Sequence, residues 1–218
     1  MKENKGLKIN NVLLFIRKNI YLVILFFGMI GFLVITNEVF NRELLGLDVV
    51  GYGLISKYLI CDFMTPIFRV VTEFGDSFVL ISIVVFSLVL IKNKKIGLSI
   101  SANLIIVTLF NLLLKNILQR PRPIEYRLIN VTGYSFPSGH SMVSMAFYGF
   151  LVYLIYRYVK NNKLKWFLIV SLMLLIVLIG ISRIYLGVHY TSDVLAGFLF
   201  SISYLMLYIK VVKRYILR

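Results

Sequence analysis

The sequence is poor in charged residues. Only 15% of its 218 residues are charged, against about 25% in an average globular protein, while 60% are hydrophobic. A water-soluble domain of this length could not bury that much apolar surface, and the mean hydropathy is +0.89. The same numbers exclude intrinsic disorder, which needs few apolar residues and many charges. We therefore expect most of the chain to be surrounded by lipid.

Cysteine and acidic residues are also scarce, and this excludes two kinds of site. Cys61 is the single cysteine, so the chain forms no internal disulfide, and with two histidines it offers too few ligands for a structural zinc site. The nine Asp and Glu residues form no cluster that would hold Mg²⁺. We expect neither a metal nor another cofactor.

Basic residues are the one abundant charge. There are 24 of them, and the net charge is +15. They stand in short clusters between apolar runs, which suits anionic lipid headgroups better than nucleic acid. The expected partners are therefore the bilayer and a lipid, with no nucleic acid.

Long apolar runs predict membrane-spanning helices. We predict six, at residues 20–37, 77–92, 97–117, 140–159, 164–183 and 190–210, of which the second is short. Residues 41–76 instead mix apolar and charged side chains, as short amphipathic helices at the membrane interface do. The predicted fold class is an all-α integral membrane protein, with residues 1–218 forming a single membrane-embedded domain.

The positions of the basic residues predict the orientation. With both termini in the cytoplasm, 16 of the 24 basic residues lie inside: Lys2, Lys5, Lys8, Arg17, Lys18, Lys92, Lys94, Lys95, Arg157, Lys160, Lys163, Lys165, Lys210, Lys213, Arg214 and Arg218. The outer side then holds eight basic residues and all the acidic residues except Glu3. Cytoplasmic loops are enriched in Lys and Arg, so this orientation is favoured.

Three segments at the outer ends of the spans carry the reactive residue types. They run from Lys115 to Pro123, from Ser135 to Ser141 and from Ser182 to Asp193. Both histidines of the chain, His140 and His189, lie in them. In the topology above all three segments open on one side of the membrane, so we expect them to form one site.

His189 and Asp193 are four residues apart, a spacing that puts two side chains on one face of a helix. Asp193 could then accept the Nδ1–H of the imidazole and leave Nε2 as a nucleophile or base. Alone, the pair also fits an i,i+4 contact at a helix end, favoured there by the helix dipole. Arg183 either adds a cation to the site or extends to the interface as an anchor.

The middle segment is suited to anion binding. Ser138 can cap the fourth span, and Gly139 lets a ligand approach the backbone closely. Free N–H groups at a helix N-terminus bind phosphate. Alone, the segment also fits an ordinary capped helix with His140 at its rim.

Polar residues on the third span share one face. Asn103, Asn111 and Lys115 are spaced by eight and four residues, so we expect them to face the bundle interior, where polar groups are functional candidates. The alternative is hydrogen bonding between helices by the two Asn residues, with Lys115 extending its ammonium group to the interface.

Arg120 and Arg122 follow in a loop that Pro121 and Pro123 stiffen. Together the three segments bring cations, a helix N-terminus, two histidines and a carboxylate to one face. Phosphoryl transfer needs this set of groups: cations for the nonbridging oxygens, a nucleophile, and an acid for the leaving group.

The order and spacing of these motifs resemble the three-part signature of the type 2 phosphatidic acid phosphatases. The matching residues are Lys115 with Arg122-Pro123, Pro137-Ser138-Gly139-His140, and Ser182-Arg183 with His189 and Asp193. The likeness covers residues 98–195 directly, and the six-span layout is similar too.

The resemblance implies that His189 is the nucleophile, Asp193 its orienting partner and His140 the general acid. It also implies a set of phosphate-binding residues: Lys115, Arg122, Ser138, Gly139 and Arg183. Only the family spacing selects Arg122 rather than Arg120. The implied activity is that of a bacterial cell-membrane lipid phosphatase, similar to phosphatidylglycerophosphate and undecaprenyl diphosphate phosphatases, with its site facing outwards.

Two other functions remain open from sequence. A lipid-linked phosphotransferase would pass the phosphate to an acceptor other than water. A transporter usually has interrupted spans and polar residues near the membrane midplane, whereas here the charges gather at one face.

The orientation can be checked with reporter fusions. A reporter placed after Arg218 should read as cytoplasmic, and one inserted within residues 118–139 as external, because the basic clusters hold the opposite ends inside. An external reading after Arg218 would overturn this orientation.

Overall fold

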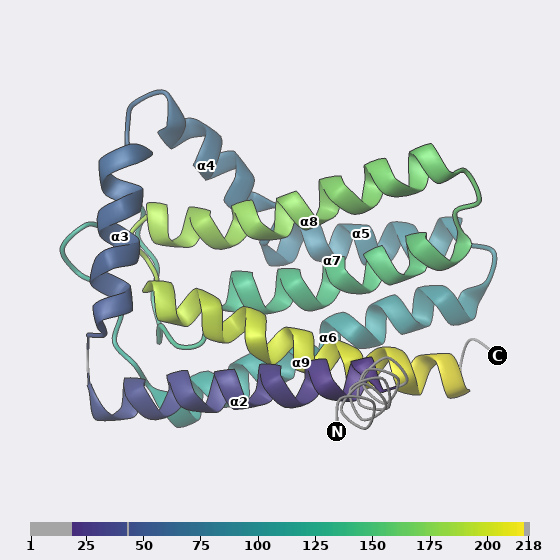
Figure 1. Cartoon of the computed structure of the whole chain (residues 1–218). Helices are drawn as coiled ribbons and strands as arrows, with labels where there is room; N and C mark the ends of the chain where they lie inside the picture. Colours follow the sequence, from purple (N-terminus) through teal and green to yellow (C-terminus); the bar gives the residue numbers. More distant parts are fainter. Residues whose placement is uncertain (1–18, 43, 216–218) are drawn as a thin grey trace, which may run out of the picture.

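The structure, a computed structural model, describes residues 19–42 and 44–215, and within these ranges it consists of α-helices joined by loops, with no strand (Figure 1). The helices are α2 (Ile20–Asn41), α3 (Gly46–Tyr58), α4 (Met64–Glu73), α5 (Ser77–Leu90), α6 (Lys94–Leu118), α7 (Gly139–Tyr158), α8 (Asn162–Tyr185) and α9 (Thr191–Tyr215). The predicted all-α class is confirmed. The basic cluster from Lys2 to Lys18 and the terminal Arg218 lie outside the described residues.

Five helices are long and apolar enough to cross a membrane: α2, α6, α7, α8 and α9. α5 has only 14 residues, but with α4, across a bend of 46°, it makes a sixth candidate span. The predicted spans are thus found, with shifted ends. The first continues to Asn41 rather than residue 37, because its last turn still packs apolar side chains such as Val39. The amphipathic segment 41–76 contains two short helices, α3 and α4, as expected.

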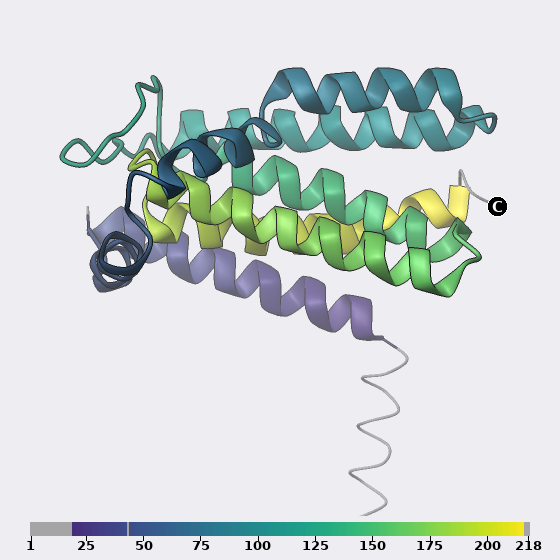
Figure 2. The same cartoon turned by 90° about the horizontal axis from the view of Figure 1, so that it is seen from above.

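The spans run lengthwise and α3 lies across one end of the bundle (Figure 1). From above, α5 and α6 form one side, α2 the other, and α7, α8 and α9 lie between them (Figure 2). α7 packs against α6, α8 and α9 and is the centre of the bundle. The loop 119–138 and the turn 186–190 both reach the end where α3 lies, so the three motif segments meet there (Figure 1).

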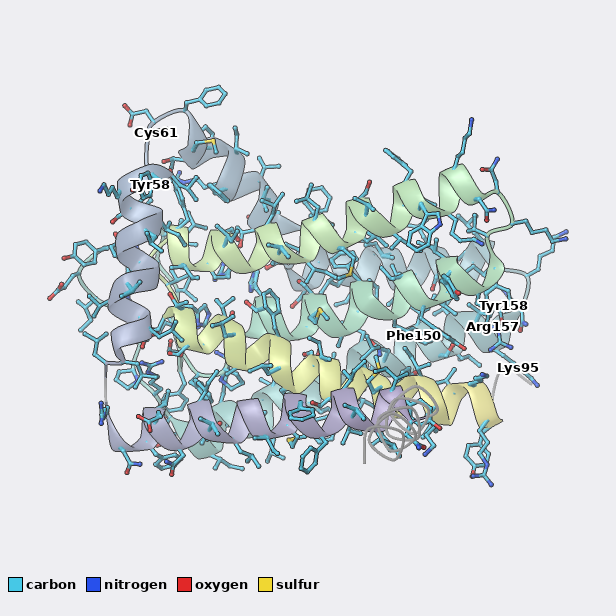
Figure 3. The ribbon with its side chains drawn as sticks, viewed as in Figure 1. Tyr58, Cys61, Lys95, Phe150, Arg157 and Tyr158 are labelled. Atoms are coloured by element: carbon cyan, nitrogen blue, oxygen red, sulfur yellow. The ribbon has the colours of Figure 1, made fainter. Side chains whose placement is uncertain are left out.

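The opposite end of the bundle carries basic residues. Lys95 and Arg157 lie there, far from Tyr58 and Cys61 at the α3 end (Figure 3). Two of the clusters that predict the cytoplasmic side therefore share one end, as the topology requires.

Local sequence explains where the central helices begin. Asn93 and Asn161 accept hydrogen bonds from the backbone N–H groups of Lys95 and Leu164, at 3.1 Å each, and cap α6 and α8. α6 ends where Gln119 adopts a left-handed backbone with φ 44°. The prolines that follow cannot continue a helix, so the chain leaves the bundle as a loop.

The core and the outer surface are both apolar. The largest buried cluster joins α7, α8 and α9 through residues such as Phe147, Ile176 and Leu205. Outward-facing side chains such as Phe27 and Leu90 are 65% and 73% exposed. This pattern suits a bundle surrounded by lipid, where the exterior need not be polar.

α4 contains a matched pair for testing stability. Phe68 is 4% exposed and stacks on Tyr185 of α8, with ring centroids 4.4 Å apart, whereas Phe63 just before the helix is 76% exposed. Phe68→Ala should destabilise the protein by about 3–5 kcal/mol, the usual effect of removing a buried aromatic ring. The thermal unfolding midpoint in detergent should fall clearly for Phe68→Ala and little for Phe63→Ala. Equal midpoints would show that α4 does not depend on this contact.

Candidate active site

The His189–Asp193 pair is present, with Nδ1 of His189 3.2 Å from Oδ2 of Asp193. The prediction that both lie on one helix is wrong. His189 lies in the turn between α8 and α9, and α9 begins only at Thr191. The backbone N–H of His189 donates to the carbonyl of Arg183 at 3.3 Å, so the end of α8 holds the turn. A spacing of four residues nevertheless brings the two side chains together, because the carboxylate of Asp193, in the first turn of α9, points toward the preceding turn and His189.

Asp193 is fully buried and has four side-chain or backbone donors around it. Its Oδ2 accepts from the Ser135 hydroxyl and from the backbone N–H of Tyr190 at 2.9 Å, in addition to the imidazole. Its Oδ1 accepts from Nη1 of Arg120 at 2.7 Å. The carboxylate is therefore fixed in position and compensated, as a buried charge must be.

The other imidazole nitrogen of His189 faces a cation. Nη1 of Arg122 is 3.0 Å from Nε2. Because an arginine can only donate, Nε2 accepts here, which places the ring proton on Nδ1 toward Asp193. Burial lowers the pKa of His189 to about 3, although Asp193 opposes the shift. The ring is therefore neutral at physiological pH, with its Nε2 lone pair directed at Arg122.

The three predicted cations reach the site from different elements, and Arg122 is the one in contact with Nε2 of His189. Arg122 is anchored through Nε to the carbonyl of Gly133 at 2.9 Å. Nζ of Lys115, at the end of α6, donates to the carbonyl of Tyr134 at 2.5 Å. The alternative that Arg183 extends to the interface is wrong, because it is 2% exposed and donates to Oγ1 of Thr72 in α4 at 2.6 Å. Nε of Arg183 has no hydrogen-bond partner among the described residues.

The start of α7 completes the site. Ser138 caps the helix as predicted, its hydroxyl accepting from the N–H of Ser141 at 3.4 Å. A Cβ at Gly139 would come within 2.9 Å of Oδ1 of Asn111, so only glycine fits easily against α6. His140 faces the same charges, namely those of Arg183, His189, Arg122 and Lys115.

The expected inward face of α6 is confirmed. Asn103 and Asn111 are 0% and 6% exposed, and Nδ2 of Asn111 donates to the carbonyl of Pro137 at 3.3 Å. Asn111 therefore holds the loop that leads into α7, which is a packing role between helices.

The sequence did not single out three residues of the site, which are Asp48, Thr72 and Ser135. It did draw attention to Arg120, but not to its role as a partner of Asp193. Arg120 does not take part as a second phosphate-facing arginine, because its guanidinium group contacts Asp48 and Asp193. The repeated Arg-Pro pair was a signal that both arginines matter. Asp48 gave a weaker signal as the one acidic residue of the amphipathic helix α3.

A cavity of ≈ 950 Å³ opens beside His189 and Arg122. It is bounded by α3, the loop after α6 and the turn before α9, and its lining is mostly apolar, with the Tyr52 and Tyr126 rings stacked 4.7 Å apart. It is much larger than a phosphate ion. Among the residues that the structure describes, no group of three or more His, Cys, Asp or Glu side chains could hold a metal ion.

Fold and site together define a class: an integral membrane protein with a buried histidine–carboxylate pair in contact with arginine side chains. The chain belongs to the PAP2 superfamily, whose family model matches residues 96–216. That region contains all three motif segments, helices α7 to α9 and all of α6 except its first two residues.

Curated relatives are lipid phosphatases by name. The chain is 40% identical to phosphatidylglycerophosphatase B of Bacillus subtilis over 91 residues, which is 41% of this chain and 45% of that protein. It therefore spans less than half the length of that relative. It is 28% identical to an undecaprenyl-diphosphatase of Sulfolobus acidocaldarius over 149 residues, covering 64% and 67% of the two chains.

Solved structures share the fold. A transmembrane PAP2-type phosphatidylglycerolphosphate phosphatase from Bacillus subtilis superposes with a TM-score of 0.74 at 25% identity, covering 89% of this chain and 96% of that one. LpxE of Aquifex aeolicus superposes with a TM-score of 0.64 at 24% identity over 77% and 98% of the chains, and supports the fold alone.

The turn that carries His189 depends on Gly187. Its φ is +67°, and a Cβ there would collide with the backbone carbonyl of Tyr126. Gly187→Ala should destabilise the protein by more than roughly 1–2 kcal/mol, the usual effect of a left-handed backbone at alanine, because the collision adds to it. Gly46→Ala in α3, where nothing lies within 4 Å, is the matched control. Similar unfolding midpoints for both variants would contradict this account of the turn.

Proposed function

We propose that this protein is a membrane lipid phosphatase that transfers the phosphate of a lipid phosphate or diphosphate to His189 and then to water. The observation that carries the proposal is the environment of His189. Its Nδ1 is held by Asp193 at 3.2 Å, its Nε2 lies 3.0 Å from Arg122, and the ring is neutral. A neutral, oriented imidazole beside cations is an activated nucleophile for a phosphate.

In the first step, the Nε2 lone pair of His189 forms a bond to phosphorus while the bond from phosphorus to the leaving oxygen breaks. His140 gives its proton to that oxygen. Asp193 stabilises the positive charge that appears on the imidazole of His189. The phosphate oxygens lie among the cations and the free N–H groups at the start of α7: Lys115, Arg122, Arg183, Ser138 and Gly139.

In the second step, His140 accepts a proton from water while the water oxygen forms a bond to phosphorus. The bond between phosphorus and Nε2 breaks, its electron pair returns to His189, and inorganic phosphate is released. The balance of charge needs no metal, because the basic side chains neutralise the phosphate. Metal independence is therefore part of the proposal. If another alcohol or phosphate took the place of water, the same site would act as a phosphotransferase.

Three features favour a lipid as the substrate. The site is at one end of a bundle of apolar spans, the adjoining cavity of ≈ 950 Å³ is mostly apolar, and it is bounded by the amphipathic helix α3. The names of the relatives point the same way. Candidate substrates are phosphatidylglycerophosphate, phosphatidic acid and undecaprenyl diphosphate, reached laterally from the outer leaflet of a bacterial cell membrane with both termini in the cytoplasm.

The direct test is phosphate release by purified protein from these three lipids and from lysophosphatidic acid. Release should persist in EDTA, and vanadate should inhibit, since its trigonal bipyramidal form resembles the transition state of in-line attack. Loss of activity in EDTA that Mg²⁺ restores would refute the metal-free mechanism. Ion flux into vesicles without phosphate release would favour a transporter.

The two histidines should fail differently. His189→Ala removes the nucleophile, so turnover of every substrate should be lost. His140→Ala removes only the acid, so turnover of a lipid phosphate should fall by up to roughly 10²–10⁴-fold. Attack on an aryl phosphate, whose leaving group needs little protonation, should be partly spared. Trapping acid-labile phosphate on His140 instead of His189 would reverse the roles.

A further inference from the structure

A buried chain of charges lies behind the His189–Asp193 pair. Arg120 donates from Nη1 to Asp193 at 2.7 Å and from Nη2 to Oδ2 of Asp48 at 2.8 Å. Arg120 is 4% exposed and Asp48 3%. The ring of Tyr190 covers the guanidinium carbon at 4.0 Å. Water therefore screens these charges little, and each one acts strongly on its neighbours.

Asp48 also ties α3 to the start of α9. Its Oδ1 accepts from the backbone N–H of Ser192, the residue before Asp193, at 2.8 Å. Its Oδ2 accepts from the N–H of Leu45 at 3.2 Å and so caps α3. One carboxylate from a helix outside the three motifs thus contacts the backbone of Ser192, next to Asp193, and Arg120, the charge partner of Asp193.

The charge balance gives Asp48 a role in the reaction. Asp48, Arg120 and Asp193 together carry one negative charge. When His189 becomes cationic, the net charge of these three residues and His189 is zero. Without Asp48, more of the positive charge of Arg120 would act on Asp193, and the negative charge left to compensate a cationic His189 would be smaller. A buried cation that is not fully compensated is strongly unfavourable, and here further cations lie nearby.

Building on the proposed function, we propose that Asp48 is a positioning residue for phosphoryl transfer. By sharing the charge of Arg120, it leaves Asp193 negative enough to stabilise the cationic imidazole that forms when His189 bonds to phosphorus. The contacts of Asp48 are with Arg120, Ser192 and Leu45, not His189, and at 3% exposure it offers little surface to the cavity that it borders. Its effect should therefore appear in the transition state and not in the binding of the phosphate.

Asp48→Asn removes the charge and keeps the size of the side chain. kcat for an aryl phosphate should fall by roughly 10–100-fold, as is usual when a group that orients a reacting side chain is lost. KM should stay the same, because Lys115, Arg122 and Arg183 keep their contacts. Vanadate should inhibit more weakly in proportion to kcat/KM, whereas inhibition by inorganic phosphate should not change.

A double variant separates charge from architecture. Asp48→Asn with Arg120→Gln restores the single negative charge of the group, so it should be faster than Asp48→Asn alone. If Asp48 only fastens α3, removing a second contact should leave the double variant no faster than the slower single variant. If Asp48→Asn fails to fold, Arg120→Lys can be measured in its place, because one ammonium group cannot bind Asp48 and Asp193 as the guanidinium group does. Inhibition of this variant by vanadate should weaken, whereas inhibition by phosphate should not change.

Asp62→Asn, the same change at an exposed carboxylate after α3, is the matched control and should behave as the wild type. Parallel loss of phosphate and vanadate inhibition in Asp48→Asn, or a double variant no faster than it, would overturn the positioning role. If the wild-type protein binds vanadate but releases phosphate from no lipid, the proposed function is wrong. The role of Asp48 can still be tested in that case, because the affinities of the variants for vanadate can be compared.

Discussion

The site depends on the burial of one carboxylate. Asp193 is 0% exposed, and an uncompensated charge at that position would strongly destabilise the fold. Its donors come from two separate stretches of chain: Arg120 and Ser135 from the loop after α6, and His189 and Tyr190 from the turn after α8. Compensating this charge therefore orders both loops, which in turn fixes the direction of the His189 ring.

The sequence predicted the spans well, because a helix that crosses lipid needs a long apolar run, and such runs can be recognised directly in the sequence. It also predicted the pairing of His189 with Asp193, but for an incomplete reason. A separation of four residues brings side chains together along a helix, and equally across a turn when the second residue lies in the first turn of the next helix. The spacing alone does not distinguish these two geometries.

The sequence could not predict the residues that depend on how distant helices meet. Arg120 contacts Asp48 across 72 positions, and Arg183 contacts Thr72 across 111. No periodicity links such positions. The burial of Arg183 follows from the placement of α4 against α8, whereas a basic residue at the end of a span ordinarily extends to the interface.

The first half of the chain contributes to each of the three motifs, although the family match begins only at residue 96. Asp48 of α3 meets Arg120, Thr72 of α4 meets Arg183, and Gly75 lies so close to His140 that a Cβ there would be 2.9 Å from the ring. The segment 41–76 is thus part of the architecture of the site as well as a candidate entrance for lipid.

The shortness of α5 has a consequence for how this span crosses the bilayer. Its 14 residues extend about 21 Å, whereas the hydrocarbon layer is about 30 Å thick, so this crossing also needs α4, which is bent by 46° against α5. The break at Gly75 lies beside His140, so the bend of this span adjoins the site.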